Sequence, residues 1–137
     1  MAVYGRQANL EILSRIPLLA GLSMGALGQV ARIADECDLR DGKVLITEGG
    51  PGGKLFVLLT GGADVRRKGR KIATMTRGDF FGEISLLTNR PATATVTLTE
   101  DSTLLAISRD GFRRLLREKP TIQRQVLDAL AERMPGD

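Results

Sequence analysis

The sequence predicts a mainly β domain with flanking α-helices, in which a double-stranded β-helix (jelly-roll) barrel lies between N-terminal and C-terminal helices. Apolar residues recur with helical spacing in about 7–35, alternate with a period of two in about 36–108, and return to helical spacing in about 110–134. Glycines at positions 42, 49, 50, 52, 53, 61, 62, 69, 78 and 82 divide the middle segment into short strands. Since 137 residues can bury a core without disulfides or metals, we expect 1–137 to form one domain.

The N-terminal segment is expected to hold two helices. Asn9–Ile16 has an apolar face and ends before Pro17, which cannot continue a helix. Ser23 is the expected N-cap of a second helix that runs to about Asp35. The apolar face of this second helix would consist of Leu27, Val30, Ala31 and Ala34.

The next residues predict the first strands. Glu36–Arg40 and Lys43–Glu48 are expected to pair as a hairpin across Asp41-Gly42. After a glycine-rich turn, Lys54–Thr60 is almost wholly apolar, which predicts a strand that is buried on both faces.

Three further strand segments complete the predicted sheets. Ala63–Lys68 and Arg70–Met75 should form a hairpin across Gly69. Ala92–Thr99 alternates between small or apolar residues and threonines, so one face should be core and the threonines should face the other way. Ser102–Ser108 is the last expected strand.

Two helices are expected after the strands. Asp110 should open a helix that is broken at Pro120, and Thr121 should cap the last helix. The last helix should stop before Pro135-Gly136. Its apolar stripe would consist of Ile122, Val126, Leu127 and Leu130.

Composition excludes several classes of function. The chain has no histidine and a single cysteine, Cys37, so it lacks the usual spacing of a zinc site and cannot form an internal disulfide. Histidine is also the commonest acid-base group, and no nucleophile–base pattern is present, so we expect neither a metal nor enzymatic activity. No signal peptide or membrane span is present, which with the lone cysteine predicts a cytoplasmic protein.

Basic residues give a net charge of +4 and gather in two clusters, one at Arg66–Lys71 and one at Arg109–Arg117. A nucleic-acid surface would combine such residues with aromatic stacking partners or a reading helix. Aromatics make up only 4% of the chain, so we interpret both clusters as solvated surface and expect no direct nucleic-acid binding.

The segment Gly78–Val96 interrupts the strand pattern and carries the candidate site. Gly82 has no Cβ, which lets a ligand or another backbone come close. Ile84–Leu87 can form one helical turn, and unpaired N–H groups at a helix start beside a glycine bind anions, phosphate above all. Glu83 lies at the mouth of this site, where a carboxylate needs a hydroxyl donor such as a ribose. The pattern predicts a ligand that carries a phosphate and a sugar hydroxyl side by side.

The run Phe81-Gly82-Glu83-Ile84-Ser85-Leu86-Leu87, followed after three residues by Pro91 and then by Thr93-Ala94-Thr95-Val96, resembles the phosphate-binding cassette of the cyclic nucleotide-binding domain family. The family includes regulatory subunits of cyclic-AMP-dependent protein kinase, bacterial cyclic AMP receptor proteins and cyclic-nucleotide-gated channels. The resemblance implies cyclic AMP, or cyclic GMP, as regulatory ligand, and terminal helices that move over the base as a lid. The residues expected at the ligand are Phe81, Gly82, Glu83, Ile84, Ser85, Arg90, Ala92 and Thr93.

One position departs from the family pattern. The residue after the cassette proline is usually an arginine that pairs with the phosphate, and here it is Ala92. A charge-assisted contact of this kind contributes roughly 1.5–3 kcal/mol. Arg90 on the same loop is a candidate replacement, although a loop arginine beside a proline is commonly a solvated charge. Thr93 is expected near the phosphate and would suit either purine.

Two hypotheses of function follow. The first is a cyclic nucleotide-binding regulatory module that transmits binding through its C-terminal helices. The second is an interaction or scaffold module of the same fold that has lost nucleotide affinity because of Ala92; Glu83 would then only cap its own helical turn. The sequence ends at Asp137 without a helix-turn-helix domain, so the output is expected in a partner, in self-association such as a homodimer, or in an effector domain of a larger protein.

Overall fold

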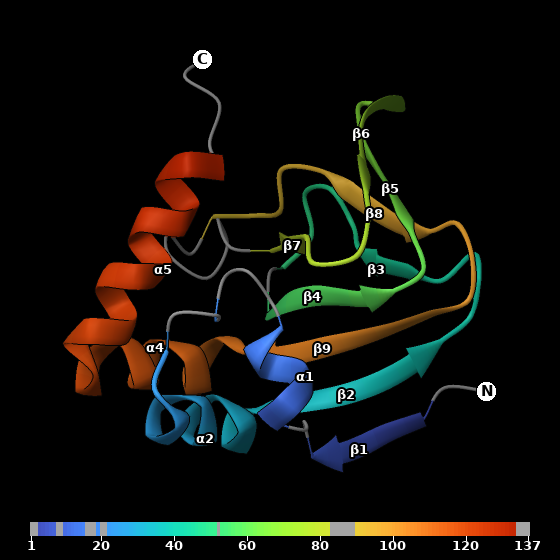
Figure 1. Ribbon diagram of the computed structural model, residues 1–137. Helices are drawn as coiled ribbons and strands as arrows, with labels where there is room; N and C mark the ends of the chain where they lie inside the picture. Colours follow the sequence, from blue (N-terminus) through green and yellow to red (C-terminus); the bar gives the residue numbers. More distant parts are fainter. Residues whose placement is uncertain are drawn as a thin grey trace.

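Two antiparallel β-sheets and four α-helices make up the computed structural model, which describes residues 3–7, 10–15, 19, 22–51, 53–82 and 90–133 (Figure 1). The five-stranded sheet has the order β1-β2-β9-β4-β7. Its strands are β1 Val3–Gln7, β2 Ala34–Leu39, β9 Ser102–Ser108, β4 Lys54–Thr60 and β7 Phe80–Phe81. The four-stranded sheet has the order β3-β8-β5-β6. Its strands are β3 Val44–Ile46, β8 Thr95–Leu98, β5 Ala63–Arg67 and β6 Arg70–Met75.

The two sheets pack face to face over a shared apolar core. This inner core takes residues from both sheets, because alternate side chains of each strand point inward. Consecutive strands often lie in different sheets, which is the jelly-roll arrangement that the glycine spacing predicts. The inner core contains Cys37, Leu39, Leu58, Ala63, Val65, Phe81, Ala94, Val96, Leu98, Leu104 and Ala106.

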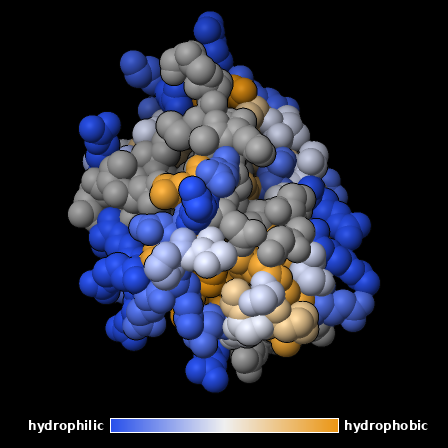
Figure 2. All heavy atoms as spheres, turned by 60° about the vertical axis from the view of Figure 1, so that its left-hand side comes forward, coloured by the Kyte–Doolittle hydropathy of each residue, from blue (hydrophilic) through white to orange (hydrophobic). Residues whose placement is uncertain are grey.

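The helices cover the other face of the five-stranded sheet (Figure 1). They are α1 Leu10–Ser14, α2 Met24–Ile33, α4 Arg109–Glu118 and α5 Pro120–Arg133. Together with the outward side chains of β4 and β9 they form an outer core. Figure 2 brings this helical side forward and shows hydrophilic side chains along both sides of the view, with a patch of apolar residues in its lower centre. No helix in the described part of the chain is long and apolar enough to cross a membrane.

Helix ends follow the capping rules. The Ala26 N–H donates to Ser23 Oγ (3.2 Å), as expected for the N-cap of α2. Ser108 caps α4 in the same way, through a 3.1 Å bond from the Gly111 N–H. The last helix begins at Pro120, a residue suited to the first helical turn, so the prediction that Thr121 caps it is wrong.

The predicted hairpin across Asp41-Gly42 is also wrong. β2 pairs with β9, whereas β3 pairs with β8 in the other sheet. The turn is therefore a corner between sheets, and the Gly42 N–H donates to the Leu98 carbonyl (2.9 Å). The hairpin of β5 and β6 is confirmed, with positive φ at both Lys68 and Gly69, the backbone of a type I′ turn. β1 was not predicted.

Candidate functional site

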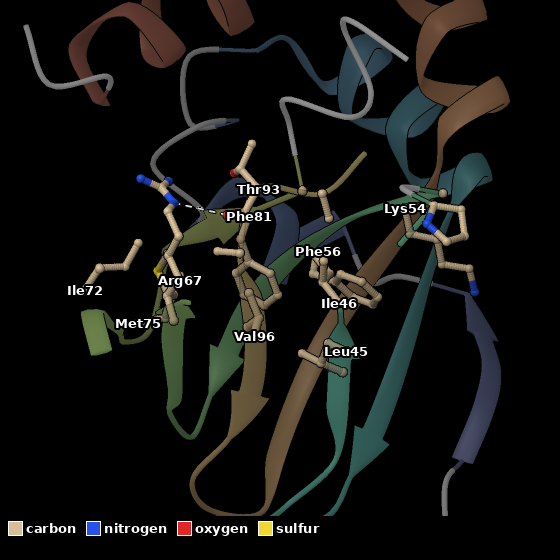
Figure 3. Close-up of a pocket in the computed structure, with 16 residues that line it drawn as sticks. Leu45, Ile46, Lys54, Phe56, Arg67, Ile72, Met75, Phe81, Thr93 and Val96 are labelled. Carbon is tan, nitrogen blue, oxygen red and sulfur yellow. Dashed lines mark hydrogen bonds between the residues drawn. The ribbon is translucent and has the colours of Figure 1, made fainter. Parts of the chain in front are cut away.

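A cavity of about 370 Å³ lies between the two sheets at one end of the inner core (Figure 3). Most of its lining is apolar and comes from six strands of the two sheets, and the cavity opens to solvent beside the exposed side chain of Ile72. These apolar side chains are Leu45, Ile46, Phe56, Val65, Ile72, Met75, Phe81 and Val96. The Phe56 and Phe81 rings are stacked, with their centroids 5.6 Å apart. This rigid aromatic pair gives the cavity a flat apolar wall.

The cavity exists because the chain that borders it carries small residues. Gly53, Gly82, Ala92 and Ala94 all line it, where larger side chains would fill the space. Ala92 and Ala94 are 8% and 9% exposed, so they belong to the interior. The alternation predicted for Ala92–Thr99 is confirmed, and the face that was assigned to the core is the one that borders the cavity.

Gly82 is required by the backbone around it. It has a φ of +97°, in the region that favours glycine, and a Cβ there would collide with the carbonyl oxygen of Lys54. The sequence analysis expected either a ligand or another backbone to come close to this glycine, and the structure shows another backbone there. The approach places the start of the cassette against β4, at the rim of the cavity.

The end of the cassette is held by hydrogen bonds to the glycine-rich turn after β3. The Ala92 N–H donates to the Gly50 carbonyl (3.0 Å), and the Gly49 N–H donates to the Ala92 carbonyl (2.8 Å). The Ala92 side chain is a methyl group at the cavity wall, and its position therefore supplies no charge to a ligand.

The two threonines that follow have different roles. Thr95 Oγ1 accepts a hydrogen bond from the Glu48 N–H (2.9 Å), which ties β8 to the turn after β3. Its hydroxyl thus has a structural partner. Thr93 is exposed and lines the cavity, as expected for a residue that contacts a ligand.

The structure therefore brings together four of the predicted site residues: Phe81, Gly82, Ala92 and Thr93. Arg90 is exposed and is not among the residues that line the cavity. Glu83, Ile84 and Ser85 lie outside the described residues, as does the helical turn predicted at Ile84–Leu87. Within the described part of the chain, no group of three or more His, Cys, Asp or Glu side chains is placed to hold a metal ion.

One cavity residue was missed by the sequence analysis. Arg67 of β5 lines the cavity, and its Nε donates to the Thr93 carbonyl (3.1 Å; Figure 3). Arg67 is exposed, in line with the interpretation of the Arg66–Lys71 cluster as solvated surface, and it also borders the cavity. Strand alternation carried the signal, because Arg67 follows Val65 at a spacing of two and so borders the same cavity.

Comparisons with known proteins agree with this geometry. The family profile of the cyclic nucleotide-binding domain matches residues 36–119. The chain is 33% identical over 115 residues to a cAMP-dependent protein kinase regulatory subunit of Aspergillus niger, covering 82% of this chain and 28% of that protein. It is 28% identical over 129 residues to a CRP-like cAMP-activated global transcriptional regulator of Mycobacterium tuberculosis, covering 90% and 58%. The chain thus spans less than two thirds of the length of either relative.

Two solved structures are similar in fold. The regulatory domain of Toxoplasma gondii PKA with cAMP superposes with a TM-score of 0.73 at 28% identity, covering 90% of this chain and 49% of that chain. A triple mutant of the regulatory subunit of a cAMP-independent protein kinase A from Trypanosoma brucei, bound to cAMP, superposes with a TM-score of 0.77 at 25% identity, covering 90% and 44%. By its family profile, its sequence relatives and its two-sheet fold, the chain belongs to the cyclic nucleotide-binding domain family.

Proposed function

We propose that this chain binds a cyclic nucleotide, cyclic AMP in the first place, and that it regulates a partner protein or an effector domain. The observation that carries the proposal is the cavity between the sheets. Gly82, near the start of the cassette, and Thr93, near its end, line this cavity together with apolar side chains. Its volume of about 370 Å³ falls in the range of roughly 300–1,000 Å³ of ligand pockets. Relatives with the same fold are described as bound to cAMP or activated by it, which supports this ligand.

The chemistry of the cavity suits the parts of such a ligand. The purine would lie against the apolar side chains of both sheets, of which Ile72 is 47% exposed before a ligand covers it. The phosphate would lie toward Thr93 and the N–H groups that the sequence predicts at Ile84 and Ser85. Glu83 would accept a hydrogen bond from the ribose hydroxyl.

A route from the cavity to the C-terminal helices supports the regulatory part of the proposal. Gly53 lines the cavity, and its carbonyl accepts a hydrogen bond from the N–H of Arg109, the first residue of α4 (3.0 Å). Helix α4 in turn packs with α5 in the outer core through Phe112, Leu115 and Ile122. A ligand that shifts Gly53 would thus act directly on the start of α4.

A second candidate is the same fold without nucleotide binding. Ala92 favours it, because the position holds a methyl group where the family pattern has a cation. The Trypanosoma brucei neighbour is described as the regulatory subunit of a cAMP-independent kinase, so membership of the family does not by itself require this ligand.

Isothermal titration calorimetry separates the two candidates. Cyclic AMP, cyclic GMP and, as a control, 5′-AMP would be titrated into the unmodified chain and into Ala92→Arg. A Kd of about 1 μM or tighter for a cyclic nucleotide, which corresponds to about −8 kcal/mol, is the expected result for the unmodified chain. Binding by the Ala92→Arg variant alone would support the non-binding module. Binding by neither would contradict the nucleotide proposal.

A further inference from the structure

The cavity carries a cation that the cassette does not provide. Strand alternation places the buried Val65 and the exposed Arg67 on the same side of β5, and both residues line the cavity. Asp64 and Arg66 lie on the opposite face of the same strand. The two-residue period of the strand thus places Arg67 at the mouth of the cavity, beside Thr93.

One hydrogen bond fixes where the guanidinium group of Arg67 lies. Arg67 Nε donates to the Thr93 carbonyl across 3.1 Å, which holds the charged group beside the end of the cassette (Figure 3). The strand that carries Arg67 is itself anchored, because the Lys68 N–H donates to Glu48 Oε1 (2.8 Å) at the tip of the hairpin. The N–H groups on the two terminal nitrogens of Arg67 form no hydrogen bond with a residue in the described part of the chain.

The charge of Arg67 is also available. Asp64, the acid nearest in the strand, lies 3.1 Å from Lys71 and 3.6 Å from Arg66, on the far face of β5. No carboxylate among the described residues forms an ion pair with Arg67. An arginine with this geometry offers a planar fork to an oxyanion.

Other cations near the cavity are less well placed. Lys54 lines the cavity from β4, but its ammonium group points away from the other labelled side chains (Figure 3). Arg90 does not line the cavity, whereas Arg67, which is likewise exposed, does. Arg67 is therefore the cation of the described lining that faces Thr93.

We propose that Arg67 binds the cyclic phosphate of the ligand and supplies, from strand β5, the positive charge that Ala92 lacks. This inference rests on the proposed nucleotide function and replaces the earlier prediction for Arg90. It explains how the site could bind a phosphodiester monoanion although the cassette itself carries a methyl group at the usual position of the arginine.

Calorimetric titration of cyclic AMP tests the inference with four proteins: the unmodified chain, Arg67→Gln, Arg67→Lys and the matched control Arg66→Gln. The control removes the same charge from the neighbouring residue on the opposite face. We expect Arg67→Gln to raise the Kd by about 10- to 100-fold, because it loses a charged hydrogen bond to the ligand. Arg66→Gln should stay within about twofold of the unmodified chain, because exposed ion pairs contribute little. Arg67→Lys should recover part of the affinity, since it keeps the charge.

The titrations distinguish a failure of the inference from a failure of the proposed function. If the unmodified chain binds and Arg67→Gln binds equally well, the role of Arg67 is overturned and the proposed function stands. If Arg67→Lys binds as weakly as Arg67→Gln, charge alone does not account for the loss, and an unchanged salt dependence of Kd in Arg67→Gln then overturns the inference. If the unmodified chain binds no cyclic nucleotide, the proposed function fails and the inference fails with it.

A rescue variant provides an independent readout. Adding Ala92→Arg to Arg67→Gln should return the affinity to within about tenfold of the unmodified chain, because the cassette then carries the charge itself. The dependence of Kd on salt should fall in Arg67→Gln and return in the double variant. An unchanged salt dependence in Arg67→Gln would contradict a charge contact with the phosphate.

Discussion

The two faces of the five-stranded sheet are packed differently. Its outer face is covered by helices, and outward side chains such as Leu55, Val57, Leu105 and Ile107 are at most 1% exposed. Its inner face meets the other sheet, where Leu58 and Leu104 are equally buried but the far end opens into the cavity. Large apolar residues fill most of the outer core, whereas two alanines and two glycines are part of the cavity lining. We infer that the outer core mainly stabilises the fold and that one end of the inner core has been left open for a ligand.

Truncation in the outer core should have the largest effect. Leu105 is 0% exposed and belongs to the outer core, so Leu105→Ala is expected to lower the free energy of unfolding by about 2–5 kcal/mol. Urea denaturation followed by circular dichroism measures this loss. A loss below about 1 kcal/mol would show that the outer core does not carry the stability assigned to it.

A Cβ at Gly82 should be the next most damaging change. Gly82→Ala forces a side chain into a positive-φ backbone and against the Lys54 carbonyl. We expect a loss of about 1–3 kcal/mol of unfolding free energy, together with loss of nucleotide binding, since the start of the cassette would move. Gly53→Ala is the matched control, because an added Cβ there meets no atom within 4 Å. Equal stability of both variants would contradict the account of Gly82.

Small-to-large substitutions compare the packing on the two faces directly. Ala31→Leu in the filled outer core should destabilise the protein by about 1–3 kcal/mol through overpacking. Ala94→Leu should cost less than about 1 kcal/mol, because the cavity can accept the side chain, and it should block the ligand. Thermal unfolding and calorimetric titration of both variants provide the two readouts. Stronger destabilisation by Ala94→Leu than by Ala31→Leu would contradict the difference between the two cores.

The smallest effect is expected at the rim of the cavity. Ile72 is 47% exposed on β6, so Ile72→Ser should change the unfolding free energy by less than about 0.5 kcal/mol. If the purine covers Ile72, the Kd for cyclic AMP should rise by about three- to tenfold from the lost apolar contact. Val44→Ser, at a similarly exposed residue that does not line the cavity, should leave the Kd unchanged.

Local patterns in the sequence were enough to predict many of the elements. Ser102–Ser108 and the hairpin around Gly69 are determined by alternation and turn chemistry within a few residues, and both are observed. Pairing between distant segments was not visible in the same way. Asp41-Gly42 has the composition of a hairpin turn, yet the strands on either side of it join different sheets.

The candidate site, too, could be predicted from the sequence only in part. Gly82 and Thr93 could be found from their motif, because the cassette is continuous in sequence. Arg67 reaches the site through a hydrogen bond to a residue 26 positions away, and its sequence neighbours are other basic residues. A charge cluster gives no sign of which member borders the cavity until the face of the strand is known. β1 was missed because Val3–Gln7 is short and largely without alternation.

The most direct test of the account is methyl NMR of the chain with ¹³C-labelled isoleucine side chains during titration with cyclic AMP. Ile46 and Ile72 line the cavity, whereas Ile107 and Ile122 belong to the outer core. The account predicts intermolecular nuclear Overhauser effects between the ligand and the Ile46 and Ile72 methyl groups. Ligand contacts confined to Ile107 and Ile122, or no change at saturating ligand, would contradict binding between the sheets.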